Sequence, residues 1–374
     1  MIDFKELMEK VGQARNNGYP FVIYRKPDES IIHGMIQKDK HLELVSDFES
    51  SGFIMAPFKK SDKAVLISKD NAERYTCTYE SIQVREWSIT HSPAYADQVY
   101  KKKEAHLSLV KKGKKFIIDD HAMKVVLSRK ELVPLSEFDS MSVFHQLISK
   151  YSSAFVYIWF HPDIGLWAGA SPETLLRTRG PVFRTMALAG TKKYEGKTDV
   201  SWDQKELKEQ QLVTDHIVEA LEGSNFVVGQ TYTKKAGNLL HICTEIGGRL
   251  QPNDSITGLI EKLHPTAAVC GFPKLEAEKF IHSKEGYDRS FYTGFLGELN
   301  LTGAKRPPNK TDGLPLVESN LFVNLRCMQI IKEPGYQSIL YVGGGITADS
   351  DPESEWQETV EKSHVMRSVI RELN

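Results

Sequence analysis

Short apolar runs separated by polar turns fill residues 1–95. An amphipathic stretch ends at Asn16-Asn17-Gly18, and the apolar runs after it are FVIYR, SIIHGMIQ, LELVS, GFIMAPF and AVLIS. Asn-Gly steps end helices, and apolar runs of this length between polar turns are typical of β-strands. The pattern therefore predicts one helix and then short strands, which form one face of a β-rich scaffold.

The next stretches switch between helical and strand periodicity. Residues 94–113 have helical spacing and are expected to end at Gly113, a typical C-terminal glycine. The run MKVVLSRKEL predicts an apolar strand opened by Lys124, although a lysine in such a place more often snorkels at a strand edge. From Ala154, the runs AFVYIWF, GLWAGASPETLLRT and VFRTMALAG predict antiparallel strands joined by Gly, Ser and Pro turns.

A helix predicted over residues 202–222 has an acidic residue in line with its apolar stripe. Glu209 extends by one turn a stripe that consists of Leu212, Val213, Ile217, Ala220 and Leu221. A carboxylate that faces inward needs a partner, because a buried unpaired charge is costly.

A second acidic helix follows near the end of the chain. Asp351 is its expected N-cap and Pro352 its first helical residue. Glu355, Glu358 and Lys362 recur at spacings of three and four, so they share a face that continues into apolar residues. Two acidic helices aimed at one place suit an oxygen-only site for Mg²⁺. A solvated face of Glu–Lys pairs is the alternative interpretation.

Two further stretches could bind anions. Gly343, Gly344 and Gly345 lie between an apolar strand and the second acidic helix, and their unshielded N–H groups could approach an anion closely. A tight turn is the alternative. In the predicted strand LFVNLRCMQII, Asn324 and Arg326 share a face with apolar residues, and the planar fork of an arginine suits a carboxylate.

Glu173 follows Ser171-Pro172 and stands among apolar residues. Desolvation would raise its proton affinity and allow it to act as a general acid, whereas an ordinary turn acid is the alternative interpretation. His241 and His264 are isolated in the sequence, and a structural role is the simpler interpretation of each.

Composition narrows the class of protein. The chain has 374 residues, with 48 Lys and Arg against 49 Asp and Glu, which gives no sign of bulk attraction to nucleic acid or membranes. Its four cysteines lack CxxC spacing and fit a reducing cytosol rather than a zinc site or a disulfide framework. The first residues carry acids and no apolar core, so no signal peptide is expected, and no apolar run approaches the ~20 residues of a membrane span.

Several of these stretches together resemble the chorismate-utilising enzymes, and most of all isochorismate synthase. The resembling stretches keep the family's order over residues 95–370. They are MKVVLSR at 123–129, GASPETLLR at 169–177, LAGT at 188–191, KEQQLV at 208–213, LHPTAAVCGFP at 263–273, LRC at 325–327, YVGGGI at 341–346 and DPESEWQET at 351–359.

The resemblance implies a fold and a reaction. The fold is α+β: two antiparallel β-sheets packed as a sandwich, helices on the outside and the active site in the cleft. The whole chain, 1–374, would form one chorismate-binding domain, with 1–95 as a divergent part of the scaffold and 95–370 as the catalytic core. Water would add at C2 of chorismate, the ring double bonds would shift and the C4 hydroxyl would leave, so no redox cofactor is needed.

Site residues are implied by position. Lys124 resembles the lysine that activates the attacking water, and Glu173 resembles the acid that protonates the departing hydroxyl. Glu209 and Glu358, with Glu355 close by, resemble the Mg²⁺ ligands. The residues that resemble the family's substrate-binding positions are Arg326, Lys362, Gly343, Gly344, Gly345, Thr191, His241 and Tyr341.

The resemblance also sets expectations about partners. Chorismate is the expected small-molecule substrate and Mg²⁺ the expected cofactor, for a monomer in the cytoplasm without nucleic-acid, membrane or glutamine amidotransferase partners. The isochorismate could feed menaquinone or catechol siderophore synthesis, and the sequence leaves that choice open. Two departures concern the site: the segment before KEQQLV is short, and Gln211 stands where relatives often carry a second acid.

Other readings of the chain are less well supported by the sequence. Anthranilate and aminodeoxychorismate synthases carry a PAG- or PGG-like segment in place of HPTAAVCG, and anthranilate synthases usually lack the lysine matched by Lys124. Salicylate synthase is nearer, because it makes isochorismate and then eliminates pyruvate. A non-catalytic chorismate-binding protein would not need both Lys124 and Glu173. A phosphoryl-transfer enzyme would need a GxxxxGK[ST] loop, which the chain lacks.

Overall fold

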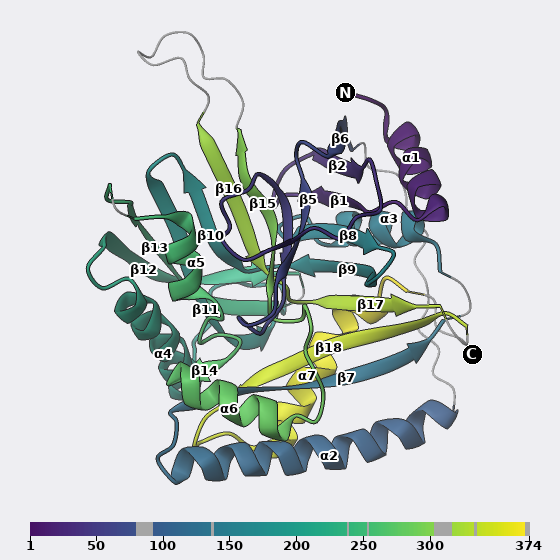
Figure 1. Cartoon of the computed structure of the whole chain (residues 1–374). Coiled ribbons are helices and arrows are strands. Elements are labelled where there is room, and N and C mark those ends of the chain that lie inside the picture. Colours follow the sequence, from purple (N-terminus) through teal and green to yellow (C-terminus); the bar gives the residue numbers. More distant parts are fainter. Residues whose placement is uncertain are drawn as a thin grey trace.

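Two packed antiparallel sheets form the centre of the protein (Figure 1). The computed structural model describes residues 1–79, 93–135, 138–237, 239–252, 254–302, 316–332 and 335–370, without the side chains of 93–101. Each sheet has nine strands in the described part of the chain, and every strand pair is antiparallel. The predicted α+β sandwich is confirmed.

The first sheet, here sheet A, carries the glycine-rich strand. Its strands in spatial order are β14 (Gly271–Phe272), β7 (Lys124–Pro134), β18 (Gln337–Ile346), β17 (Cys327–Ile331), β9 (Gly165–Ser171), β8 (Phe155–His161), β1 (Phe21–Arg25), β2 (Ile31–Gln37) and β6 (Ala72–Thr78).

The second sheet, sheet B, ends in two long neighbouring strands. Its strands in spatial order are β12 (Asn225–Ala236), β13 (Leu239–Arg249), β11 (Val182–Lys193), β10 (Thr174–Arg179), β16 (Val317–Val323), β15 (Phe295–Thr302), β4 (Gly52–Ala56), β5 (Ala64–Ser68) and β3 (Leu44–Val45). Strands from residues 1–79 thus complete both sheets, three in each.

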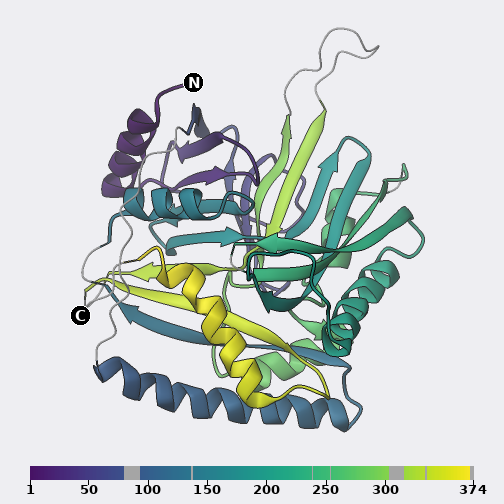
Figure 2. The same ribbon diagram turned by 180° about the vertical axis from the view of Figure 1, so that it is seen from behind.

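Helices cover the outer faces of the sandwich. They are α1 (Phe4–Asn17), α2 (Pro93–Ile118), α3 (Ser140–Lys150), α4 (Gln204–Ala220), α5 (Ile256–Leu263), α6 (Lys274–Lys284) and α7 (Pro352–Arg367). Figure 2 shows α7 lying across β18 and β7, with the long α2 beside it. The predicted Asp351 N-cap is confirmed, since its side chain accepts a hydrogen bond from the Ser354 N–H.

Aromatic side chains hold the two sheets together. The central cluster contains Tyr24, Trp159 and Trp167 from sheet A and Phe53 and Phe322 from sheet B, all buried. Such rings bury large apolar areas and gain a further contribution from stacking geometry. The two sheets are therefore fixed against each other by side chains close to where the chain crosses between them.

One helix is longer than the sequence indicates. The prediction that a helix ends at Gly113 is wrong, because α2 continues to Ile118. A Cβ atom on Gly113 would lie 2.8 Å from Leu127 Cδ1 of β7. The glycine serves close packing of α2 on sheet A, not termination of the helix.

The strand predicted for LFVNLRCMQII is two strands in two sheets. β16 ends at Val323 in sheet B, β17 begins at Cys327 in sheet A, and residues 324–326 join them. Arg326 has a left-handed backbone with φ 47°, which an uninterrupted strand does not contain. The predicted shared strand face of Asn324 and Arg326 is therefore wrong.

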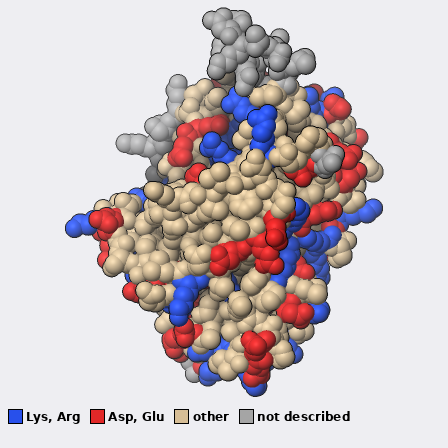
Figure 3. Space-filling model, turned by 90° about the vertical axis from the view of Figure 1, so that its left-hand side faces the viewer, with Lys and Arg blue, Asp and Glu red and all other residues tan. Residues whose placement is uncertain are grey.

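The surface carries both charges. On the face drawn in Figure 3, acidic and basic side chains are intermixed, in keeping with the near balance of charge in the sequence. Among the described residues, no helix combines the length and apolar character that crossing a membrane requires.

Candidate active site

A cavity opens where the chain crosses between the sheets. It is lined by residues of β18, β11, β13, α4, α7 and the crossing segments. The predicted site residues that line it are Glu173, Thr191, Glu209, His241, Arg326, Tyr341, Gly343, Gly344, Gly345, Glu358 and Lys362. Lys124 and Glu355 lie next to this lining, because Lys124 contacts Glu209 and Glu355 lies beside Gly344.

Two crossing segments run side by side at the base of the cavity. Pro172-Glu173 links β9 of sheet A to β10 of sheet B, and residues 324–326 link β16 back to β17. The Val323 N–H donates to the Glu173 carbonyl at 3.0 Å, and the Ala170 N–H donates to the Arg326 carbonyl at 3.0 Å. An acid and an arginine far apart in the sequence are thus held on adjacent backbone segments.

Glu173 is a buried carboxyl group that retains its proton at neutral pH. Its side chain is 3% exposed, and Oε1 has no hydrogen-bond partner in the described structure. Burial raises the pKa of Glu173 to about 8, although Lys124 and Lys234 offset part of the rise. A carboxyl group in this state can donate a proton.

Arg326 is the second polar group at the crossing. Burial lowers the pKa of its guanidinium, and nearby Tyr292 and Glu358 oppose that shift. An arginine nevertheless stays charged in proteins, and Nη1 is buried without a hydrogen-bond partner among the described residues. Tyr157 and the Phe291 carbonyl hold the neighbouring Asn324 side chain at 2.7 and 2.9 Å, which fixes the segment. The cavity therefore contains a positioned cation whose Nη1 has no partner among the described residues.

Each of the three carboxylates expected to bind Mg²⁺ is paired with a lysine. Glu209 Oε1 lies 2.9 Å from Lys124 Nζ, and Glu358 Oε1 lies 2.5 Å from Lys362 Nζ. Glu355 Oε1 lies 2.7 Å from Nζ of Lys205, a residue of α4 that the sequence analysis missed. Lys205 precedes Glu209 by one helical turn, so its place on the same face could have been read from the spacing.

Glu355 and Glu358 differ in their electrostatic environment. Burial and the nearby Glu358 charge raise the pKa of Glu355, and Lys205 offsets only part of this. Burial acts in the same direction on Glu358, but Lys362, Lys205 and Arg326 bring its pKa below the ordinary value. Glu358 is therefore the carboxylate that the site holds ionised.

The triple glycine is part of strand β18 and forms neither a tight turn nor a nest of successive N–H groups. It pairs with β7, with Gly343 opposite Ser128 and Gly345 opposite Val126. The N–H groups of Ser128 and Val126 bond away from β18, to Glu285 and Cys270. In an antiparallel ladder, two directly opposite residues either hydrogen-bond to each other or both point their backbone groups away from each other. Gly343 and Gly345 are in pairs of the second kind, so their N–H and C=O groups point away from β7.

Those outward groups reach the cavity because β17 stops short. β17 pairs with β18 only over Gln337–Tyr341, and beyond that the Gly343 carbonyl accepts from Lys362 Nζ at 2.9 Å. A Cβ on Gly345 would lie 2.3 Å from Glu209 Oε1, and one on Gly344 would lie 3.3 Å from Glu355 Oε2. The glycines thus leave room for the carboxylates, and the N–H groups of Gly343 and Gly345 are open to a ligand.

His241 is a neutral hydrogen-bonding group. Its Nδ1 lies 2.8 Å from the Gly190 carbonyl, and burial, reinforced by Arg326, lowers its pKa to about 3. A carbonyl can only accept, so Nδ1 carries the proton and the buried Nε2 is left as an acceptor. Thr191 lies next to Gly190 on β11 and lines the same cavity.

Tyr341 contributes its ring rather than its hydroxyl. The ring stacks on Trp167 and Tyr292 with centroids 5.2 and 5.3 Å apart, and the hydroxyl donates to Gln329 at 3.2 Å. Gln211 of α4 is exposed and bonds to Asp215 at 2.6 Å, so it does not face the carboxylates.

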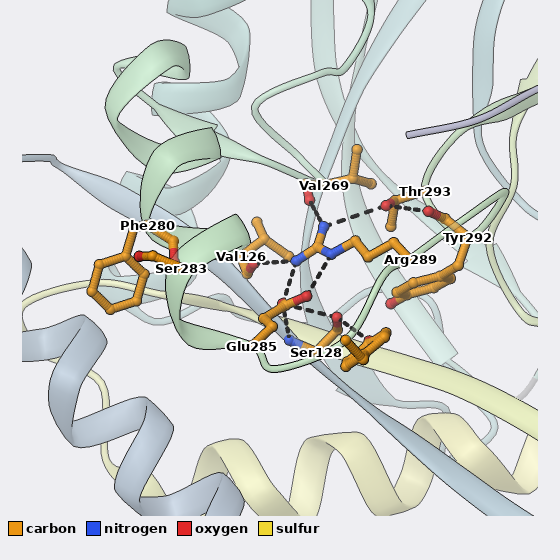
Figure 4. A network of polar contacts seen from close by, with 10 residues as sticks. Val126, Ser128, Val269, Phe280, Ser283, Glu285, Arg289, Tyr292 and Thr293 are labelled. Carbon is orange, nitrogen blue, oxygen red and sulfur yellow. Dashed lines mark hydrogen bonds and ion pairs between the residues drawn. The ribbon is translucent and has the colours of Figure 1, made fainter. Parts of the chain in front are cut away.

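A buried ion pair supports one wall of the cavity (Figure 4). Arg289 donates to Glu285 Oε2 at 2.8 Å, to the Val126 carbonyl at 2.7 Å and to the Val269 carbonyl at 2.9 Å. Val126 and Val269 line the cavity. Glu285 and Arg289 are only four residues apart, but the carbonyl groups of Val126 and Val269 that hold Arg289 lie on segments that only the fold brings together.

The carboxylates suit a hard divalent cation by donor type. Glu355 Oε2 is buried without a hydrogen-bond partner, and it lies beside Glu358 above Gly344. Carboxylate oxygens are the donors that Mg²⁺ prefers. No ready-made cluster of three metal-binding side chains occurs in the described part of the chain, because each carboxylate is held by a lysine.

Comparison with known proteins gives one family. Residues 56–371 match the family described as "Chorismate binding enzyme". The "Salicylate biosynthesis isochorismate synthase" of Pseudomonas aeruginosa is 31% identical over 66% of this chain and 50% of its own length. The "Anthranilate synthase component 1" of Thermococcus kodakarensis is 26% identical over 72% of this chain and 60% of its own length.

A solved structure supports the fold. The putative 2,3-dihydroxybenzoate-specific isochorismate synthase of Bacillus anthracis superposes with a TM-score of 0.75 at 22% identity, over 97% of this chain and 99% of that chain. The matches to the two curated relatives, by contrast, cover 50% and 60% of those longer proteins.

Proposed function

The chain belongs to the family of chorismate binding enzymes, and we propose that within this family it is an isochorismate synthase. It converts chorismate to isochorismate by adding water at C2 and releasing the C4 hydroxyl. The observation that carries the proposal is that two polar groups lie on adjacent backbone segments in the cavity. They are Glu173, a buried proton-bearing acid, and Arg326, whose Nη1 has no partner among the described residues.

Two groups handle protons on the two sides of the ring. Glu173 donates a proton to the departing hydroxyl, which leaves as water. Lys124, as the neutral amine, takes a proton from the attacking water. Solvent then carries that proton back to Glu173, so the overall cycle is balanced. Lys124 Nζ is 0% exposed and lies 2.9 Å from Glu209, a setting in which that carboxylate orients the amine. Assistance of this kind typically contributes ~10²–10⁴-fold each.

The substrate dianion meets the cations and the open backbone of β18. Arg326 and Lys362 bind carboxylates, and the outward N–H groups of Gly343 and Gly345 add donors. The His241 Nε2 acceptor and Thr191 suit a ring hydroxyl, and the Tyr341 ring closes one side of the cavity. Prepositioned groups of this kind lower the barrier by orientation and electrostatic stabilisation.

Glu209 and Glu358, with Glu355 beside them, would hold Mg²⁺, which supplies positive charge for a substrate carboxylate. Lys205 keeps Glu355 in place through their 2.7 Å contact. In the ligand-free state, Lys205 and Lys362 offset the charges of Glu355 and Glu358.

Salicylate synthase is the second candidate, because it forms isochorismate first and uses the same groups. It would additionally eliminate pyruvate. The relative named for salicylate biosynthesis is itself an isochorismate synthase by name, so it supports the first candidate.

Product analysis tests the proposal. Purified protein is incubated with chorismate and Mg²⁺, with and without ammonium, and the products are separated. Isochorismate as the main product supports the proposal. Salicylate with pyruvate moves the assignment to the second candidate, and anthranilate from added ammonium, or no turnover, overturns it.

A further inference from the structure

The site contains more positive charge than its own acids neutralise. Three lysines lie in contact with the carboxylates: Lys124 with Glu209, Lys205 with Glu355 and Lys362 with Glu358. Glu173 retains a proton at neutral pH. Arg326 is a cation that forms no ion pair with an acidic side chain in the described part of the chain, and its Nη1 has no hydrogen-bond partner there.

Lys234 of β12 is a second cation of this kind. It pairs in register with His241 of β13, so both side chains lie on the same face of sheet B. His241 and Leu188 on that face line the cavity. Lys234 is half-buried and reaches across the sheet to Met186, with Nζ 3.6 Å from the thioether sulfur.

A thioether sulfur is a poor partner for an ammonium group. Sulfur in methionine is only a weak acceptor. No acidic side chain forms an ion pair with Lys234 within the part of the chain that the structure describes. Partial burial without a counter-ion is costly, and a bound anion would relieve that cost.

We propose that Lys234 binds the substrate at the rim of the active site, where its ammonium group pairs with one of the two carboxylates while Arg326 pairs with the other. The assignment rests on the proposed function, because it takes the ligand to be a dicarboxylate. It gives β12, the edge strand of sheet B, a direct part in substrate selection: ligands with two carboxylates bind better than ligands with one.

The neighbouring Lys235 provides a matched control. It carries the same charge on the same strand, but adjacent strand residues face opposite sides of the sheet. Its Nζ lies 3.7 Å from the centroid of the Tyr194 ring, on the far side from the cavity residues. Lys235→Met therefore removes one positive charge from β12 without removing a group from the site.

Chorismate binding is measured by calorimetry with Mg²⁺ in a Glu173→Gln background, where turnover is slowed. Lys234→Met is expected to weaken binding on the order of 10-fold or more, as for loss of a charge-assisted hydrogen bond. Lys235→Met should leave binding unchanged, and Lys234→Arg should restore most of it. The difference in chorismate affinity between Lys234→Met and the parent should shrink at high salt, because salt screens a charge contact at the solvent-exposed rim.

The kinetic split gives the second readout in the otherwise unmodified enzyme. Lys234→Met should raise KM by a similar factor with kcat little changed. A fall in kcat with KM unchanged would overturn the assignment, since Lys234 would then act on Glu173 instead. If Lys234→Met and the parent bind chorismate equally well, the assignment of Lys234 is overturned, but the proposed function is not. A parent protein that does not bind chorismate would overturn the proposed function and this assignment together.

Discussion

Burial sets the chemistry of the individual residues in this site. The Glu173 carboxyl is enclosed with one oxygen unpartnered, and its pKa rises to about 8. His241 is enclosed in the same cavity, and its pKa falls to about 3. Both shifts follow from the cost of a charge in an apolar setting, so both groups are neutral at pH 7. The acid can donate, and the imidazole Nε2 can only accept.

The pH dependence of activity tests the role of Glu173. The acid must be protonated to donate, so kcat/KM should fall as pH rises through about 8. Glu173→Gln should lower kcat at least ~10²-fold while chorismate still binds, and the residual activity should lack that basic limb. Steady-state rates from pH 6 to 9.5 give both results. A basic limb that persists unchanged in Glu173→Gln would assign it to another group.

The same pKa shift has a consequence for stability. The pKa of Glu173 is about 8 in the folded protein, against 4.5 for an exposed glutamate in the unfolded chain. Between those values the unfolded chain binds fewer protons, so the contribution of Glu173 to the free energy of unfolding is lost as pH rises towards 8. Denaturation of the Glu173→Gln protein at several pH values should lack this part of the slope.

At the scale of elements, three pieces of backbone create the site. Helices α4 and α7 supply the three carboxylates and two of the three lysines that contact them. Strand β18 runs next to these carboxylates and has glycine at positions 343, 344 and 345. β17 ends early and leaves the Gly343 and Gly345 backbone groups open. The acids could not approach one another over a strand with ordinary side chains.

Alanine at Gly345 tests that argument. The new Cβ would lie 2.3 Å from Glu209 Oε1 and 2.8 Å from Lys124 Cε, so the Lys124–Glu209 pair must move. Gly345→Ala should lower kcat/KM at least ~10-fold more than Gly344→Ala, whose nearest contact is 3.3 Å. Neither glycine has a positive φ, so both variants are expected to fold. Equal activity of the two variants, with unchanged melting temperatures, would contradict the close packing.

Charge removal on the two helices tests the proposed Mg²⁺ ligands. Glu209→Gln and Glu358→Gln should each weaken Mg²⁺ binding at least ~10-fold, because each removes a negative oxygen donor from a hard-cation site. Glu219→Gln on the exposed side of α4 is the control. Calorimetry of Mg²⁺ binding in the presence of chorismate measures the effect. Normal Mg²⁺ affinity in either variant would remove that residue from the site.

At the scale of the whole molecule, the sequence predicted elements better than it predicted their placement. The patterns around Glu209 and Glu358 located two helices with inward acids, because helical periodicity is a local property. The crossings at Glu173 and at Arg326 were not predicted, since an apolar run gives no sign of the sheet that it joins. Lys205 was missed although it lies one helical turn from Glu209, and Lys234 was missed because the residues beside it, Met186 and His241, come from other strands.

The conversion of chorismate in ¹⁸O-labelled water tests the central claim most directly. Mass spectrometry of the products at early times, with Mg²⁺ present, follows the oxygen. The account predicts isochorismate that carries one ¹⁸O atom at C2, while unreacted chorismate is unlabelled. Unlabelled isochorismate would mean that the hydroxyl migrates without water addition. Formation of pyruvate or anthranilate in place of isochorismate would contradict the proposed reaction itself.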